Sequence, residues 1–124
     1  MAKILVAEDE RDIRDLIGFT LRFSGFDVVT VTNGEEAIAA ALVEMPDLIL
    51  MDGRMPKMTG YEACQKIKET PAIAHIPVVF LSAKGQESEI RAGIDSGATE
   101  YLLKPFAPDD LTDKVKTILA QIGK

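Results

Sequence analysis

Five short apolar runs, each about as long as a β-strand, recur along the chain. They lie at residues 4–7, 28–31, 48–51, 78–81 and 101–103. Most of their residues are Val, Ile or Leu, which favour strands. Between and after these runs, apolar residues recur at helical spacing, as in Ile13, Leu16, Ile17 and Leu21. The pattern therefore predicts a strand followed by a helix, five times over.

Helix start signals agree with this alternation. Asn33 with Glu36, and Thr59 with Glu62, have the spacing of an N-cap residue and the third residue of a helix. Pro108, followed by two aspartates, is typical of a first helical turn. These residues predict where three of the helices begin.

Alternating strands and helices with short connections predict a parallel sheet covered by helices on both faces. The second run contains more polar residues than its neighbours, and the fifth carries Glu100 and Tyr101, so we place both at the edges of the sheet. The predicted fold is α/β: a single doubly wound (βα)5 domain over residues 1–124. Its five-stranded parallel sheet has the flavodoxin-like order 2-1-3-4-5, with a topological switch point between the first and third strands.

Composition narrows the classes of partner. The 124 residues include 14 Lys and Arg against 20 Asp and Glu, a formal net charge of −6, without a basic cluster. This balance disfavours direct binding to nucleic acid or to a membrane surface. No apolar run approaches the roughly 20 residues of a membrane span, and the lone Cys64 cannot form an internal disulfide. We expect a cytoplasmic protein that binds other proteins or small ions.

Acidic residues follow two neighbouring strands of the predicted sheet. Asp52 ends the third strand, and Glu8 and Asp9 follow the first. Ligands of such sheets bind outside the carboxyl ends of the strands at the switch point, so these three carboxylates would share one crevice. They would repel one another unless a cation lies between them. Mg²⁺ is the natural candidate, held by the carboxylates, by a backbone carbonyl such as that of Arg54, and by water.

Two further polar residues are expected at the same edge. Ser82 lies at the end of the fourth strand and Lys104 at the end of the fifth. A hydroxyl and an ammonium group both bind phosphoryl oxygens. With a carboxylate nucleophile and a divalent cation, they make up a set suited to phosphoryl transfer onto Asp52.

Over essentially its whole length the chain resembles a response-regulator receiver domain of two-component signalling, of the stand-alone type found in chemotaxis regulators. The match is carried by Glu8 and Asp9, by the loop Asp52-Gly53-Arg54-Met55-Pro56, by Ser82-Ala83 and by Lys104-Pro105. The resemblance implies that Asp52 accepts a phosphoryl group from a histidine kinase or phosphotransfer protein. It implies that Mg²⁺ is held by Glu8, Asp9, Asp52 and the Arg54 carbonyl, and that Ser82 and Lys104 bind the phosphoryl oxygens.

The resemblance also implies a switch. Tyr101 matches the family's switch aromatic, and Ser82 moves onto the phosphoryl group, which changes the surface of the fourth helix, the fifth strand and the last helix for a downstream protein. Whether phosphorylation also drives dimerisation stays open. One amphipathic helix follows Lys104, so we expect a stand-alone receiver or one excised from a longer chain. The family often has Asp at the position of Glu8. It also often has a bulky apolar residue where this chain has Gly53, and the glycine is expected to loosen the loop.

Three other functions are open alternatives. A pseudo-receiver would bind partners without phosphorylation, although the full set of site residues disfavours it. A flavodoxin-like nucleotide or flavin binder would want Gly, Ser or Thr where the first loop has Glu8 and Asp9. A phosphohydrolase with an aspartyl intermediate would need an acid two residues after Asp52, where Arg54 stands.

Overall fold

The strands and helices alternate as the apolar pattern predicts. The computed structural model describes residues 2–53, 55–83, 91, 97–98, 100–104 and 107–124. Its strands are β1 (Lys3–Ala7), β2 (Asp27–Val31), β3 (Leu48–Asp52), β4 (Val78–Ala83) and β5 (Glu100–Lys104). Its helices are α1 (Arg11–Phe23), α2 (Gly34–Glu44), α3 (Gly60–Glu69) and α5 (Pro108–Gln121). The helix predicted around Ile90 and Ile94 falls largely outside the described residues.

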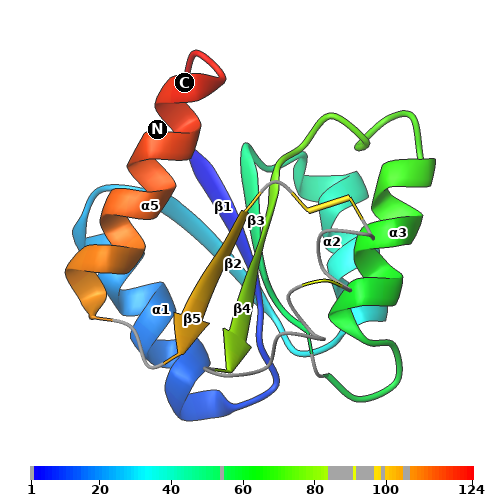
Figure 1. Cartoon of the computed structure of the whole chain (residues 1–124), viewed down its shortest axis with the longest axis horizontal. Helices are drawn as coiled ribbons and strands as arrows, with labels where there is room; N and C mark the ends of the chain where they lie inside the picture. Colours follow the sequence, from blue (N-terminus) through cyan, green and yellow to red (C-terminus); the bar gives the residue numbers. More distant parts are fainter. Residues whose placement is uncertain (1, 54, 84–90, 92–96, 99, 105–106) are drawn as a thin grey trace.

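All five strands pair in parallel in the order β2-β1-β3-β4-β5 (Figure 1), which confirms the predicted topology. The apolar residues of β1 and β3 are buried, whereas the residues of β2 are only half-buried or exposed. An edge strand has one neighbour instead of two, and this is why β2 tolerates polar residues.

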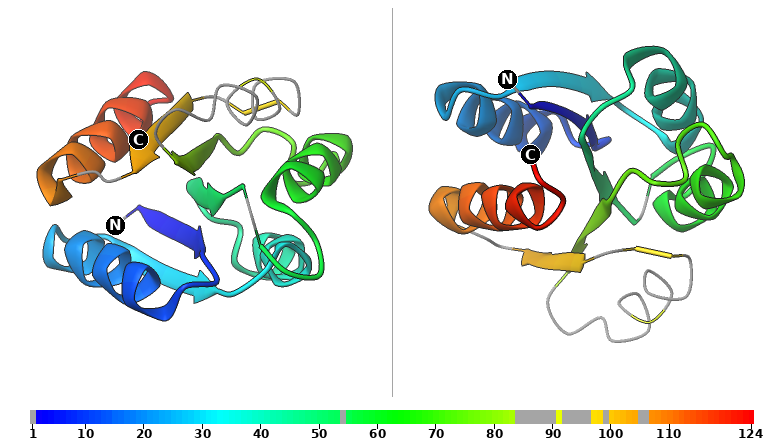
Figure 2. Two further views of the ribbon diagram at one scale, coloured as in Figure 1. Left: turned by 60° about the horizontal axis from the view of Figure 1, so that its bottom comes forward. Right: turned by 90° about the horizontal axis from the view of Figure 1, so that it is seen from above.

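Helices cover both faces of the sheet, α1 and α5 on one side and α2 and α3 on the other (Figure 2). Successive strand residues point to opposite faces, so Ile4 and Val6 belong to the core under α1 and α5, and Leu5 and Ala7 to the core under α2 and α3. Because both faces are buried, the central strands read as continuous apolar runs.

Two predicted helix starts have the expected hydrogen bonds. The Asn33 side chain accepts a hydrogen bond from the Glu36 amide at 2.9 Å. Thr59 and Glu62 form a reciprocal capping box at the start of α3. α5 begins with Pro108, as predicted. The start of α3 matters for the site, since this helix follows the loop that leaves Asp52.

The direction of the strands determines where the loops gather. The carboxyl ends of the strands lie at the lower edge of the sheet in Figure 1, and both chain termini lie toward the opposite edge. In the part of the chain that the structure describes, no helix has both the length and the apolar character needed to cross a bilayer.

Candidate functional site

Glu8, Asp9 and Asp52 converge at the carboxyl edge of the sheet. Ala7 pairs with Met51 across β1 and β3, so the residues that follow these two strands emerge side by side. One carboxylate oxygen from each acid lies within 4.8 Å of the others. Glu8 is buried, Asp52 is half-buried and Asp9 is exposed. The arrangement predicted from the strand ends is therefore present.

The loop after β1 is fastened by hydrogen bonds that hold two of the acids in place. The Glu8 amide donates to the Val31 carbonyl at 3.1 Å, and the Glu8 carboxylate accepts from the Glu10 amide at 3.3 Å. The Arg14 guanidinium donates to the carbonyl oxygens of Glu8 at 3.0 Å and Asp9 at 3.3 Å. The sequence patterns did not identify Arg14 as part of the site, although it is a basic residue six positions after Glu8 and five after Asp9.

The donor set fits a hard divalent cation. Among the described residues it offers three carboxylate oxygens, the ligand type that Mg²⁺ prefers, and Asp9 is exposed to water. Burying a charged carboxylate is costly unless the charge is compensated, and further acids beside it increase this cost; Glu8 is buried beside two such acids. A cation between the three side chains would relieve both penalties.

The loop that leaves Asp52 is held at several points. The Gly60 amide donates to the Gly53 carbonyl at 3.1 Å, and the Gly34 amide donates to the Met58 carbonyl at 3.2 Å. Lys57 has a φ of 66°, in the left-handed region, where the loop turns back toward α3. The loop is thus tied to both α2 and α3. Arg54, whose carbonyl is a predicted ligand, lies outside the described residues.

The remaining predicted site residues lie on β4 and β5. Ser82 follows Leu81, the register partner of Asp52, and Lys104 ends β5 opposite Ala83. Their backbones therefore reach the same edge, while their side chains lie outside the described part of the structure. Tyr101 is half-buried, pairs in register with Phe80 and packs against the core under α2 and α3.

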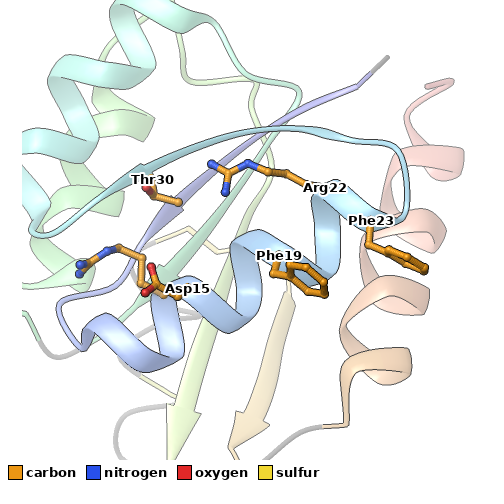
Figure 3. A pocket seen from close by; sticks show the side chains of 6 residues that line it. Asp15, Phe19, Arg22, Phe23 and Thr30 are labelled. Atoms are coloured by element: carbon orange, nitrogen blue, oxygen red, sulfur yellow. The ribbon is translucent and has the colours of Figure 1, made fainter.

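A separate surface pocket of about 530 Å³ lies beside α1. Phe19 and Phe23 project from the outer side of this helix. Arg22 of α1 and Thr30 of β2 also line the pocket (Figure 3). The two rings stack with centroids 6.2 Å apart, although Phe19 is 68% and Phe23 84% exposed. Such an exposed apolar patch is of the kind found at protein interaction sites.

Comparison with known proteins places this geometry in a family. Residues 4–116 match the family model described as the response regulator receiver domain. The chain is 40% identical over 117 residues to the alkaline phosphatase synthesis transcriptional regulatory protein PhoP of Bacillus subtilis, covering 94% of this chain and 48% of that protein. A crystal structure of a putative response regulator from Chloroflexus aurantiacus superposes with a TM-score of 0.92 at 33% identity, covering 96% of this chain and 98% of that one.

The comparisons correct one expectation about partners. The chain is also 37% identical over 124 residues to the DNA-binding dual master transcriptional regulator RpaA of Synechocystis, covering 100% of this chain and 52% of that protein. The chain spans about half the length of the curated relatives it matches. The prediction that excluded direct nucleic-acid contact is therefore wrong, because it judged partners from the charge of this segment alone.

Receiver domains bind Mg²⁺ at an acidic pocket, and Glu8, Asp9 and Asp52 form such an acidic cluster here. Fold, strand order and family model agree over nearly the whole chain. The chain therefore belongs to the response regulator receiver domain family of two-component signalling.

Proposed function

We propose that residues 1–124 form one phospho-accepting receiver domain in which Asp52 takes a phosphoryl group from a histidine of a partner kinase or phosphotransfer protein. The observation that carries this proposal is the convergence of Glu8 and Asp9 on Asp52 at the carboxyl edge of the sheet. A half-buried carboxylate beside two others is a poor structural choice, but it is a suitable acceptor where a cation offsets the charge.

The chemistry proposed for Asp52 is an in-line displacement. A carboxylate oxygen of Asp52 attacks phosphorus, the bond from phosphorus to the donor nitrogen breaks, and the electron pair of that bond stays on the histidine. Water later attacks the phosphorus, releases inorganic phosphate and restores the carboxylate. Glu8, Asp9, Asp52 and the Arg54 carbonyl would hold Mg²⁺, which when bound supplies positive charge next to the phosphoryl oxygens.

Ser82 and Lys104 are assigned to the phosphoryl oxygens. Their backbone positions at the ends of β4 and β5 support this assignment, because both strands end at the edge where Asp52 lies. Tyr101 is assigned to the switch that carries the phosphorylated state to the surface of β5 and α5. Its half-buried position is compatible with a ring that changes its degree of burial.

The partners follow from the family. A histidine kinase or phosphotransfer protein supplies the phosphoryl group, and the switched surface acts on a downstream partner. We include DNA-dependent transcription control among the outputs, because PhoP and RpaA are named as transcriptional regulators.

The deciding experiment is intact mass spectrometry after incubation with acetyl phosphate, with and without Mg²⁺. We expect a gain of one phosphoryl group that requires Mg²⁺ and is absent in Asp52→Asn. Asp113→Asn is the matched control, since Asp113 is an exposed acid on α5. If the native protein gains no mass under conditions where Mg²⁺ binds, the pseudo-receiver function is the better one. Labelling of Asp52→Asn would assign the acceptor to another residue.

A further inference from the structure

The residue after the acceptor faces an aromatic ring at very close range. A Cβ atom placed on Gly53 would overlap the hydroxyl oxygen and Cζ of Tyr61 and would lie 3.0 Å from its Cε1. The φ angle of Gly53 is not in the left-handed region. The obstacle to a side chain at position 53 is therefore the Tyr61 ring and not an unusual backbone conformation.

The half-buried Tyr61 ring packs against the core under α2 and α3. It lies 4.9 Å from the ring of Phe80, centroid to centroid, at an interplanar angle of 44°, and Phe80 is 1% exposed. Tyr61 is the second residue of α3, whose start is fixed by the capping box of Thr59 and Glu62. The ring is thus held on one side by β4 and on the other by the backbone that follows Asp52.

The backbone on both sides of this contact is also packed tightly. The Gly60 amide donates to the Gly53 carbonyl, and a Cβ on Gly60 would overlap the Asp52 carbonyl oxygen and lie 3.0 Å from its carbon. The first turn of α3 therefore presses directly on the peptide unit that joins Asp52 to Gly53. A shift in this turn would rotate the peptide and redirect the Asp52 side chain.

We propose that Tyr61 is a positioning residue for Asp52. Its ring fills the space that a side chain at position 53 would take, and it fixes the backbone after Asp52 so that the carboxylate faces Glu8 and Asp9. The functional part of this inference rests on the proposed role of Asp52 as acceptor. It replaces the expectation that Gly53 loosens the loop.

The inference predicts that a side chain at position 53 and a ring at position 61 exclude each other. We would compare Gly53→Ala, Tyr61→Leu and the double variant, measuring the melting temperature, Mg²⁺ affinity by calorimetry and the rate of phosphorylation by acetyl phosphate. Gly53→Ala is expected to slow phosphorylation roughly tenfold and to weaken Mg²⁺ binding, because small misplacements of a reacting group reduce rates strongly. The double variant is expected to recover to within about threefold of the native rate, as contacting residues are not additive.

Two controls separate the ring contact from other effects. Tyr61→Phe keeps Cζ and Cε1, so it should not rescue Gly53→Ala. Gly34→Ala introduces a Cβ that would lie 2.5 Å from the Met58 backbone carbonyl oxygen. A smaller side chain at position 61 cannot relieve this clash. Tyr61→Leu should therefore rescue Gly53→Ala and leave Gly34→Ala unrescued.

A positioning role also makes Tyr61→Leu alone slow phosphorylation and weaken Mg²⁺ binding at temperatures where the variant is fully folded. The proposal is overturned if Tyr61→Leu changes only the melting temperature. It is also overturned if Tyr61→Leu rescues Gly53→Ala in none of the three measurements. If the native protein accepts no phosphoryl group, the proposed function fails by itself. The melting temperatures and Mg²⁺ affinities of the same variants still decide the role of Tyr61.

Discussion

At the scale of single residues, the site brings three acidic side chains close together. Two charges 4 Å apart in water interact by about 1 kcal/mol, and the interaction grows as water is excluded. Glu8 is fully buried, and Asp9 and Asp52 approach it within 4.8 Å. A cation bound between these side chains is therefore expected to stabilise the folded chain.

Removing one of the charges tests this directly. Without divalent cations, Asp9→Asn is expected to raise the free energy of unfolding by up to about 1 kcal/mol, because Asp9 is the exposed member of the cluster. Adding Mg²⁺ should raise the melting temperature of the native protein and leave that of the variant nearly unchanged. Thermal unfolding with and without Mg²⁺ measures both effects, and equal stabilisation of the two proteins by Mg²⁺ would contradict the assignment.

Sequence patterns reach some residues of the site and miss others. The meeting of Glu8, Asp9 and Asp52 could be predicted, since parallel strands place their carboxyl ends at one edge and the apolar runs show where each strand ends. The contact of Gly53 with Tyr61 could not, because nothing in the spacing of two residues reveals that a ring fills the place of a missing side chain. Arg14 was missed because its hydrogen bonds go to backbone carbonyls, so its spacing from the two acids does not by itself reveal them.

At the scale of elements, the two sides of α1 face very different surroundings. Leu21 is fully buried in the core shared with α5, whereas Phe23, two residues later, is 84% exposed beside the pocket on the outer side of the helix. Hydrophobicity alone would rank both as core residues. Their position around the helix decides which one supports the fold.

Matched substitutions on α1 should show this difference. Leu21→Ala is expected to lower the free energy of unfolding by about 2–5 kcal/mol, since it leaves a cavity in a packed core. Phe23→Ser should change it by no more than about 0.5 kcal/mol, as surface substitutions usually do. Urea unfolding of both variants provides the measurement, and a comparable loss in Phe23→Ser would mean that the exposed ring is part of the core.

The start of α3 offers a second test at this scale. Thr59→Ala removes the side chain that accepts from the Glu62 amide at 3.2 Å, and it is expected to lower the free energy of unfolding by about 1 kcal/mol. Thr59→Ser keeps the hydroxyl and should keep most of the stability. Equal losses in the two variants would show that the methyl group, and not the cap, is responsible.

Element types could be predicted well and their ends less well. Lys3 and Asp27 begin their strands one residue before the apolar runs, because strand pairing uses backbone groups and accepts polar side chains at a strand end. Met45, the residue that caps the end of α2, has a φ of 47°, at a position where a sequence pattern would look for glycine. Local signals therefore identify the elements, and tertiary contacts decide their last residues.

At the scale of the whole molecule, side-chain contacts at the edge opposite the site connect residues near both ends of the chain. Asp47 accepts from the Lys3 amide at 2.8 Å and pairs with the Lys124 ammonium at 3.0 Å. Lys3 also pairs with Glu44 at 2.9 Å. These contacts connect the first strand, the segment before β3 and Lys124, which follows α5, at the edge opposite the acids.

The pH dependence of this connection is set by Asp47. Burial raises the pKa of Asp47, but the hydrogen bond from the Lys3 amide and the charge and hydrogen bond of Lys124 together outweigh it, so the pKa lies below its ordinary value. A carboxyl group with a lowered pKa in the folded state binds protons less readily there than in the unfolded chain. Its contribution to stability is therefore complete above its unfolded pKa, about 3.9, and is lost as the pH falls through the lower folded value.

Comparing the native protein with Asp47→Asn measures how much the charge of Asp47 contributes to the free energy of unfolding. At pH 7 the variant is expected to be less stable by on the order of 1 kcal/mol, since it loses charge-assisted contacts at a partly exposed position. The difference should shrink as the pH falls below about 4, because the native carboxyl group then takes up the proton that removes its advantage. All other groups are the same in the two proteins, so their contributions cancel in the difference. A gap between the two urea unfolding curves that stays constant from pH 7 to pH 3 would show that shape and not charge makes Asp47 stabilising.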